Sequence, residues 1–461
     1  NTYNIAIGHH AGKEVTTGGE NVLIGGLAGT YLTTGSYNVA IGKSALSTED
    51  AHGKNIAIGW GTLATLNAGA DAYNIAIGHN SGTYLTTGVE NTIIGGLAGD
   101  ALTTGSSNVA LGYNALSTED AHGRNIAIGS SALTTLNAGA DAYNIAIGFN
   151  AGYAVTTGVQ NTIIGGLAGD ALTTGSQNTA VGYGALSTED ANGRNTAIGY
   201  GALNLLNAGA EGFNTAVGDL AGTAMTTGTN NTIVGGLAGD ALTTGSNNVV
   251  MGHAALGGAN GGESRNVAIG HSALLVMDFN GSNNNVAVGY EAGKAVSTGV
   301  NNTIIGTECG DAITTGGNNI IIGKSAAASA VDVSNEITLG DANINAFRCA
   351  DQSIAALSDG RDKTDIKNSS YGLEFINTIR PVEFTWNFRP ENMAEAKQGK
   401  KRVGFIAQEL QEAMPNSENE ILDLVYSVSD ERIEAKYGNL IPILVKAVQE
   451  LSERVKQLEN K

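Results

Sequence analysis

Proline is nearly absent from this 461-residue chain: there are four, and none lies in residues 1–344. The two cysteines, Cys309 and Cys349, are too few for a disulfide framework, and we expect buried free thiols. Lys and Arg number 24 against 43 Asp and Glu, a formal net charge of −19. This acidity argues against nucleic acid and anionic lipid as partners, because both require a basic surface. No stretch approaches 18 consecutive apolar residues, so we expect no membrane insertion.

Glycine, in contrast, is abundant and periodic, with 61 of 66 glycines in residues 1–344. Nineteen copies of an asparagine, a three-residue run and a glycine recur there, beginning with Asn4–Gly8. They lie 17 to 19 residues apart, in a cycle that restarts every 70 residues from Asn74 onward. A twentieth copy, Glu336–Gly340, replaces the asparagine. A period this short indicates stacked coils rather than a globular domain.

Each copy is typical of a short β-strand that ends at a glycine corner, where a positive φ is easily reached. The residue after the asparagine is Ile, Val or Thr, and the residue before the glycine is Ile, Leu, Val or Met. These two positions share one face of the strand, which we expect to line the coil interior. The residue between them is usually Ala, and we expect it to point outward. Larger residues stand there once per cycle, as a predicted contact stripe between chains: Leu23, Ile93, Ile163, Ile233 and Ile304.

The asparagines have two interpretations. Asparagine suits turns and stacks well in repeated strands, which favours a ladder of side-chain amides that bond the backbone of the next coil. The alternative is a row of sugar or ion ligands. All seven histidines lie in the repeats, but they do not converge in sequence on one position, so we predict no metal site and no cofactor.

The sequence therefore predicts a mainly β protein in two parts. Residues 1–344 form a β-solenoid shaft of about twenty 17–19-residue coils, and residues 345–461 form a small α+β domain. Residues 1–344 carry 8 Lys and Arg against 24 Asp and Glu, a net charge of −16, whereas the second part is almost neutral. If each coil rises by one strand spacing, the shaft is ~90 Å long.

Residues 345–461 have a different pattern. Arg380–Trp386 is typical of a strand, and Val403–Leu410 of a strand that leads into a helix ending near Pro415. The last segment has apolar residues spaced 3 and 4 apart, the heptad pattern of a coiled-coil helix. These residues, called the heptad seam below, are Ile441, Leu444, Val448, Leu451, Val455 and Leu458.

Three segments of this part resemble a known family. Ser358–Ile366 is similar to the S-D-x-R-x-K-x-x-I signature that opens the intramolecular chaperone domain of phage tail fibres and tailspikes, the S74 peptidase family. Val403–Leu410 resembles its G-F-I-A-Q-E-L segment, and Tyr437–Leu451 its Y-x-x-L-I-P…K-A-x-Q-E-L end. Separately, the N-x-A-I-G coils are similar to the head repeats of trimeric autotransporter adhesins.

The S74 resemblance implies a domain that brings three fibre chains into register and then cuts itself off in a single turnover. It implies Ser358 as the nucleophile, Lys363 as the base and Ser358–Asp359 as the scissile bond, with Asp359 and Arg361 as positioning residues. From the residues alone, Ser358–Gly360 could equally be a turn, with Arg361 and Lys363 solvated.

The leading hypothesis is a homotrimeric phage tail fibre or tailspike segment for attachment to the host surface, made in the host cytoplasm and located in the virion. Its expected partners are a host cell-surface receptor, a polysaccharide included, and other tail proteins. One alternative is a glycan-degrading tailspike that uses a carboxylate pair, but Glu49–Asp50, Glu119–Asp120 and Glu189–Asp190 recur with the period, which favours a solvated corner. A bacterial trimeric adhesin would need a membrane anchor, which the end of this sequence does not offer.

Overall fold

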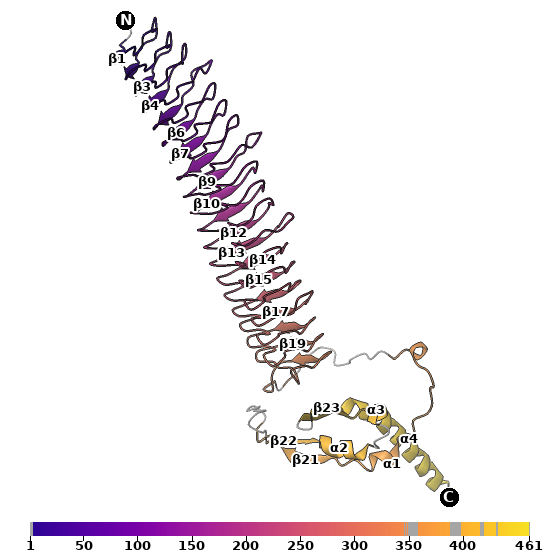
Figure 1. Ribbon diagram of the computed structural model, residues 1–461. Coiled ribbons are helices and arrows are strands. Elements are labelled where there is room, and N and C mark those ends of the chain that lie inside the picture. The colour runs from indigo at the N-terminus through magenta and orange to yellow at the C-terminus, as the bar shows by residue number, and fades with distance from the viewer. Residues whose placement is uncertain are drawn as a thin grey trace. The chain divides into compact units, whose positions relative to one another are not determined.

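The computed structural model in Figure 1 describes residues 3–344, 346, 348, 358–387, 398–414, 419–429 and 432–460. The chain divides into two compact units, Asn1–Leu339 and Gly340–Lys461. The first unit is a solenoid of twenty parallel three-residue strands, as predicted. The strands are β1 Ile5–Ile7, β2 Val22–Ile24, β3 Val39–Ile41, β4 Ile56–Ile58, β5 Ile75–Ile77, β6 Thr92–Ile94, β7 Val109–Leu111, β8 Ile126–Ile128, β9 Ile145–Ile147, β10 Thr162–Ile164, β11 Thr179–Val181, β12 Thr196–Ile198, β13 Thr215–Val217, β14 Thr232–Val234, β15 Val249–Met251, β16 Val267–Ile269, β17 Val286–Val288, β18 Thr303–Ile305, β19 Ile320–Ile322 and β20 Ile337–Leu339.

The coils are joined by an asparagine ladder inside the solenoid, which confirms the first interpretation of these residues. The Oδ1 atom of Asn74 accepts a hydrogen bond from the backbone N–H of Asn91, one coil later, at 3.0 Å. Its Nδ2 group donates to the carbonyl of Gly88 at 2.9 Å. The asparagine side chains from Asn21 to Asn319 are buried. The amides of this ladder thus satisfy backbone donors and acceptors that would otherwise be unpaired in the interior, except that the Nδ2 group of Asn266 donates to the side chains of Asn248 and Asn283.

The faces of the strands are the reverse of our expectation. The middle residue of each strand points into the solenoid, and the first and third residues are half-buried or exposed on the outside. The physical reason is the asparagine: it lies two residues before the middle position, so a buried asparagine places the middle side chain on the interior face as well. The predicted outward stripe of Leu23 and its equivalents is therefore wrong, since all five are fully buried.

A glycine makes room for each larger middle residue. A Cβ atom on Gly29 would lie 2.8 Å from Cδ2 of Leu23, and one on Gly99 would lie 3.3 Å from Cγ2 of Ile93. The glycine thus leaves the space that the large side chain occupies inside the same coil.

The glycine at the end of each strand is required by the backbone. Gly95, for example, has φ +140°, and a Cβ atom there would lie 2.3 Å from the carbonyl oxygen of Gly112 in the next coil. Both the conformation and this close approach exclude other residues, which confirms the predicted corner.

The last coil ends the ladder. Glu336 takes the place of the asparagine, and its backbone N–H still donates to Oδ1 of Asn319 at 2.9 Å. Its carboxylate turns back within its own coil and accepts from the hydroxyl of Ser329 and from that of Thr338, the latter at 2.8 Å. Thr338 replaces the apolar middle residue of β20. The terminal strand thus carries polar groups where the other strands carry core residues.

The second unit combines two hairpins with helices. Strands β21 (Val382–Thr385) and β22 (Lys401–Gly404) are antiparallel, as are β23 (Val425–Ser429) and β24 (Arg432–Ala435). The helices are α1 (Leu373–Ile376), α2 (Ala407–Ala413), α3 (Asn419–Leu422) and α4 (Leu440–Glu459). The predicted strands and the long C-terminal helix are therefore present. Within the described part of the chain, no helix combines the length and apolar character needed to cross a membrane.

Candidate functional site

The residues of the predicted Ser–Lys pair lie in contact. Ser358 precedes a short 3-10 turn, Gly360–Asp362, and Lys363 follows it, so the turn folds the two side chains together. The Nζ group of Lys363 donates a hydrogen bond to Oγ of Ser358 at 2.6 Å. This distance suits proton transfer between the two groups. Both residues are exposed in the single chain.

Asp359 and Arg361 hold the turn that forms this pair. The carboxylate of Asp359 caps the turn by accepting from the backbone N–H of Arg361 at 2.9 Å and also pairs with the guanidinium of Arg361. These hydrogen bonds, chiefly the one from the guanidinium, lower the pKa of Asp359. Asp359 and Arg361 thus act on the local backbone and do not touch Ser358 or Lys363 through any hydrogen bond found among the described residues.

The second and third motif segments meet each other. The hydroxyl of Tyr437 accepts a hydrogen bond from the backbone N–H of Phe405 at 3.2 Å, and the two rings pack edge to face. A Cβ atom on Gly404 would lie 2.8 Å from that hydroxyl. The glycine that ends β22 is therefore needed for the contact. Sequence reasoning missed this pair, although a glycine directly before an aromatic residue at the end of a strand is a signal of close approach.

A further contact, also missed, joins the long helix to the region after the Ser–Lys turn. The carboxylate of Glu450 in α4 accepts from the backbone N–H of Leu373 at 2.8 Å, at the start of α1. This hydrogen bond is the main cause of the lowered pKa of Glu450. A Cβ atom on Gly372 would lie 2.5 Å from the same carboxylate. The contact fixes the start of α1 against the middle of α4.

The heptad seam of α4 is exposed along its whole length. Its six residues keep between 45% and 71% of their surface accessible. Only Leu440, Ile443 and Ala447 of this helix are buried within the unit. An apolar helix face of this size on one chain is an unpartnered surface of the kind that coiled coils bury.

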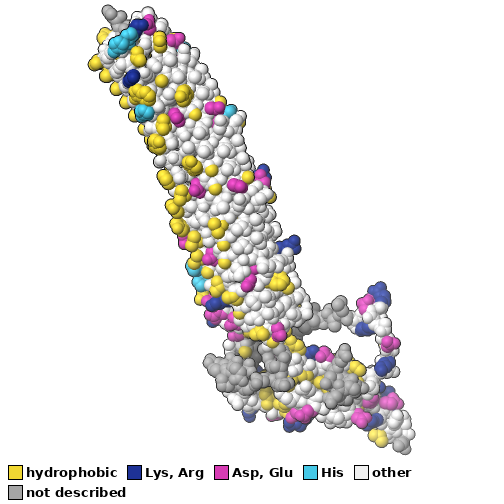
Figure 2. All heavy atoms as spheres, viewed as in Figure 1, with side chains coloured by type: hydrophobic (Ala, Val, Ile, Leu, Met, Phe, Trp, Pro, Cys, Tyr) yellow, Lys and Arg dark blue, Asp and Glu magenta, His cyan; other side chains and the backbone are white. Residues whose placement is uncertain are grey.

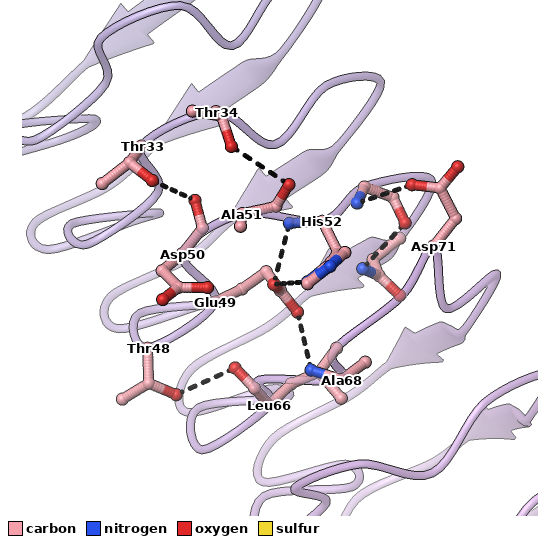
Figure 3. A network of polar contacts seen from close by, with 12 residues as sticks. Thr33, Thr34, Thr48, Glu49, Asp50, Ala51, His52, Leu66, Ala68 and Asp71 are labelled. Atoms are coloured by element: carbon pink, nitrogen blue, oxygen red, sulfur yellow. Dashed lines mark hydrogen bonds and ion pairs between the residues drawn. The ribbon is translucent and has the colours of Figure 1, made fainter.

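In the solenoid, the recurring glutamate is a structural group and not the solvated corner that we expected. Glu49 is fully buried, and its carboxylate accepts from the backbone N–H of His52 at 3.1 Å and of Ala68, one coil later, at 3.3 Å (Figure 3). Burial raises its pKa. Glu119 and Glu189 make the same pair of contacts in the next two cycles. The carboxylate thus fastens the two-residue insertion of each cycle, which makes it a poor candidate for glycan cleavage.

Glu49, Asp50 and His52 bring one potential metal-ligand atom each to within 4.8 Å of one another, as do Glu119, Asp120 and His122. The third cycle has Asn192 in place of the histidine, and its side chain donates to Glu189 at 3.2 Å. An asparagine donor thus serves at this position, whereas the Nδ1 atoms of His52 and His122 lie 3.5 Å and 3.4 Å from the carboxylates of Glu49 and Glu119 and have no hydrogen-bond partner among the described residues.

Comparison with known families identifies the second unit. Residues 358–417 match the family Peptidase_S74, described as the chaperone of endosialidase. The match begins at Ser358, the residue whose hydroxyl contacts Lys363. No curated protein and no solved structure matches the chain. The protein thus combines a parallel β-solenoid with a C-terminal segment that matches the S74 chaperone family, a combination consistent with a tail fibre or tailspike-like protein.

Proposed function

We propose that this chain is a segment of a phage tail fibre that assembles as a homotrimer, attaches the virion to the host surface and releases its C-terminal domain by cutting the Ser358–Asp359 bond. The observation that carries the proposal is the Ser358–Lys363 contact at 2.6 Å, at the start of the segment that matches the chaperone family and directly after a twenty-coil shaft.

The chemistry of the pair requires assembly. A serine hydroxyl becomes a nucleophile when a base removes its proton, and a lysine acts as a base only when burial or a nearby positive charge depresses its pKa. In the single chain the amine of Lys363 is exposed and donates to the serine. Neighbouring chains that cover the turn would supply the missing burial. Cleavage would then occur only after the chains have associated correctly, and the released fragment would indicate that association.

The second unit offers a surface for that association. The exposed heptad seam of α4 is buried if the same helix from other copies packs against it. The seam has Leu at one heptad position and Ile or Val at the other, a pattern that by itself favours two strands, although three heptads are too few to decide the number. The rest of the domain would select three chains.

The length of the shaft suits a role in holding a contact surface away from the rest of the particle. A parallel solenoid of twenty strands spans ~90 Å at one strand spacing per coil. Stacked coils of nearly equal sequence can slip by one coil while keeping most contacts, so a terminal domain that aligns the chains removes an ambiguity that the shaft itself cannot resolve.

Cleavage is tested by denaturing gel electrophoresis of the purified protein. We expect the wild type to yield a fragment with the length of residues 359–461, and Ser358→Ala and Lys363→Ala to remain intact. Ser452→Ala and Lys367→Ala are matched controls, because both residues are exposed in the same domain and lie outside the pair and the seam.

A wild-type chain that stays intact as a folded oligomer would refute self-cleavage. The stoichiometry is tested separately by light scattering on the Ser358→Ala variant, for which we expect the mass of three 46.7 kDa chains. A monomer would refute the fibre.

A further inference from the structure

The outside of the solenoid sheet carries four columns of side chains. Two are the first and third residues of the strands. The leading column consists of the residue directly before each asparagine, and the trailing column of the residue directly after each strand-ending glycine. The first and third residues face outward by the alternation of the strand, and the residues of the two edge columns, which flank the strand, are mostly exposed. We call them together the outward sheet face.

This face lacks charge in its centre. None of the first or third residues of the twenty strands is charged; all are Ile, Val, Leu, Met or Thr. They are half-buried or exposed in the single chain, and Figure 2 shows apolar side chains gathered along one long side of the solenoid. An uncharged strip of this length is unusual on a shaft with a net charge of −16, and it indicates a contact surface.

The trailing column contains glycines that the fold does not require. They recur at Gly26, Gly96, Gly166 and Gly236, once per 70-residue cycle. None of the four has a positive φ, and a Cβ atom on any of them would come no closer than 3.4 Å to another atom. Other coils hold Trp60 or Tyr113 at the same position. The backbone and packing of the single chain therefore leave room for a side chain at these four positions.

The leading column carries polar side chains on the same four coils. The residues there are Glu20, Glu90, Gln160 and Asn230, all exposed. Like the leading residues of the other coils, each has a positive φ, here 59° or 60°. A polar side chain at the leading edge thus accompanies a glycine at the trailing edge of each of these coils.

We infer that copies of this chain associate in parallel and in register, with the outward sheet faces turned toward a common axis and the leading column of one copy packed against the trailing column of the next. If the copies are related by rotation about that axis alone, equivalent coils lie at the same height along it. The side chain of Glu90 then lies against the space left by the missing side chain at Gly96 of the neighbouring copy. This contact is heterologous and closes into a ring. The inference rests on the proposed trimer and names the surface that forms it.

The available area is sufficient. The face is ~90 Å long, and the six residue steps between its edge columns span up to ~20 Å when extended. Shared between two neighbours, this exceeds the roughly 800 Å² per partner of a stable interface. The charges of the two edge columns are also compatible with this contact. Where the leading residue is basic, the trailing residue of the same coil is uncharged, in the pairs Lys54 with Trp60, Arg124 with Ser130 and Arg194 with Tyr200. No repulsion between lysine or arginine side chains therefore opposes the same-height contact on these coils.

Paired cysteines test the register. In the full-length Ser358→Ala, Cys349→Ala background, Glu90→Cys is combined with Gly96→Cys. The two positions flank β6 in one chain, about 20 Å apart when extended, whereas a disulfide needs Cα atoms within about 7 Å. Any disulfide must therefore join two chains. The control combines Glu90→Cys with Gly166→Cys, four coils or ~19 Å higher. Gln160→Cys with Gly166→Cys repeats the test one cycle on.

We expect oxidation to convert the same-coil variants into covalent trimers on a non-reducing denaturing gel, with at least a tenfold lower yield in the control. A trimer by light scattering without these cross-links would overturn the inference but leave the proposed trimer intact. Equal yields in the control would overturn it as well, and a monomer would overturn both. If instead a host receptor covers this face, the cysteines stay reactive toward a maleimide in the assembled fibre.

Discussion

The asparagine ladder leads to a sharp prediction in the middle of the shaft. The Oδ1 atom of Asn161 accepts from the backbone N–H of Asn178 at 2.9 Å, and its Nδ2 group donates to the carbonyl of Gly175 at 2.9 Å. Asn161→Ala removes both bonds and leaves a buried donor and a buried acceptor unpaired. Each such group costs about 1–3 kcal/mol, so we expect the local stability to fall by roughly 2–6 kcal/mol.

The measurement is hydrogen exchange by mass spectrometry on the full chain. Because each coil contacts only its neighbours, the loss should be local. At 1.4 kcal/mol per factor of ten, even the lower bound predicts exchange about 30-fold faster in peptides that cover β10 and β11. Peptides that cover β17 and β18, far along the shaft, should keep their wild-type rates.

Asn137→Ala is the matched control, because Asn137 is exposed in a loop of the same part of the shaft and should change stability by less than about 0.5 kcal/mol. Asn161→Asp separates the two bonds: it keeps the acceptor for Asn178 but loses the donor to Gly175. If Asn161→Ala exchanged no faster than Asn137→Ala around Asn178, the amides would not be what joins the coils.

Two further predictions concern groups buried in the shaft. Asp100 has a buried carboxylate oxygen without a hydrogen-bond partner among the described residues, and burial raises its pKa, whereas Thr30 at the same place in the first cycle donates its hydroxyl to a backbone carbonyl at 2.7 Å. Asp100→Thr should therefore raise the free energy of unfolding at pH 7 by about 0.5–1.5 kcal/mol. The pKa of Asp100 is higher in the folded than in the unfolded state, so the wild type becomes more stable as the pH falls through that pKa. Thermal melts should therefore show a smaller difference in stability between variant and wild type near pH 4. Cys309 is fully buried and its pKa is raised to about 11, so in a Cys349→Ala chain a thiol reagent at pH 8 should react only after denaturation; fast reaction of the native protein would contradict the packed interior.

The period of the shaft was predictable because the residues that repeat are those that the backbone of each coil requires. The strand-ending glycines meet the backbone of the next coil, as Gly95 meets Gly112, so no other residue can stand there. The asparagines satisfy backbone groups and are equally constrained. The pairing of Ser358 with Lys363 was predicted from the family resemblance, because the residues alone also allowed a turn with a solvated lysine.

The faces of the strands were not predictable from apolar character alone, because all three strand positions are apolar or β-branched. The interior side was decided by the buried asparagine, a polar residue that we did not use as a marker of burial. Glu49 was misjudged for a related reason: a recurring carboxylate looks like a solvated corner until the backbone donors of His52 and Ala68 are placed around it. The contact of Tyr437 with Phe405 joins segments 32 residues apart and depends on the tertiary fold.

The final coil has a consequence for solubility. A parallel sheet with an open last strand is a template on which further chains can add, as in amyloid growth. The carboxylate of Glu336 accepts hydrogen bonds from Ser329 and Thr338, and this residue has no side-chain amide that could bond to an added strand. An added strand would also remove water from its negative charge, which is unfavourable. We therefore expect the acid that breaks the repeat to disfavour the addition of a further strand to β20.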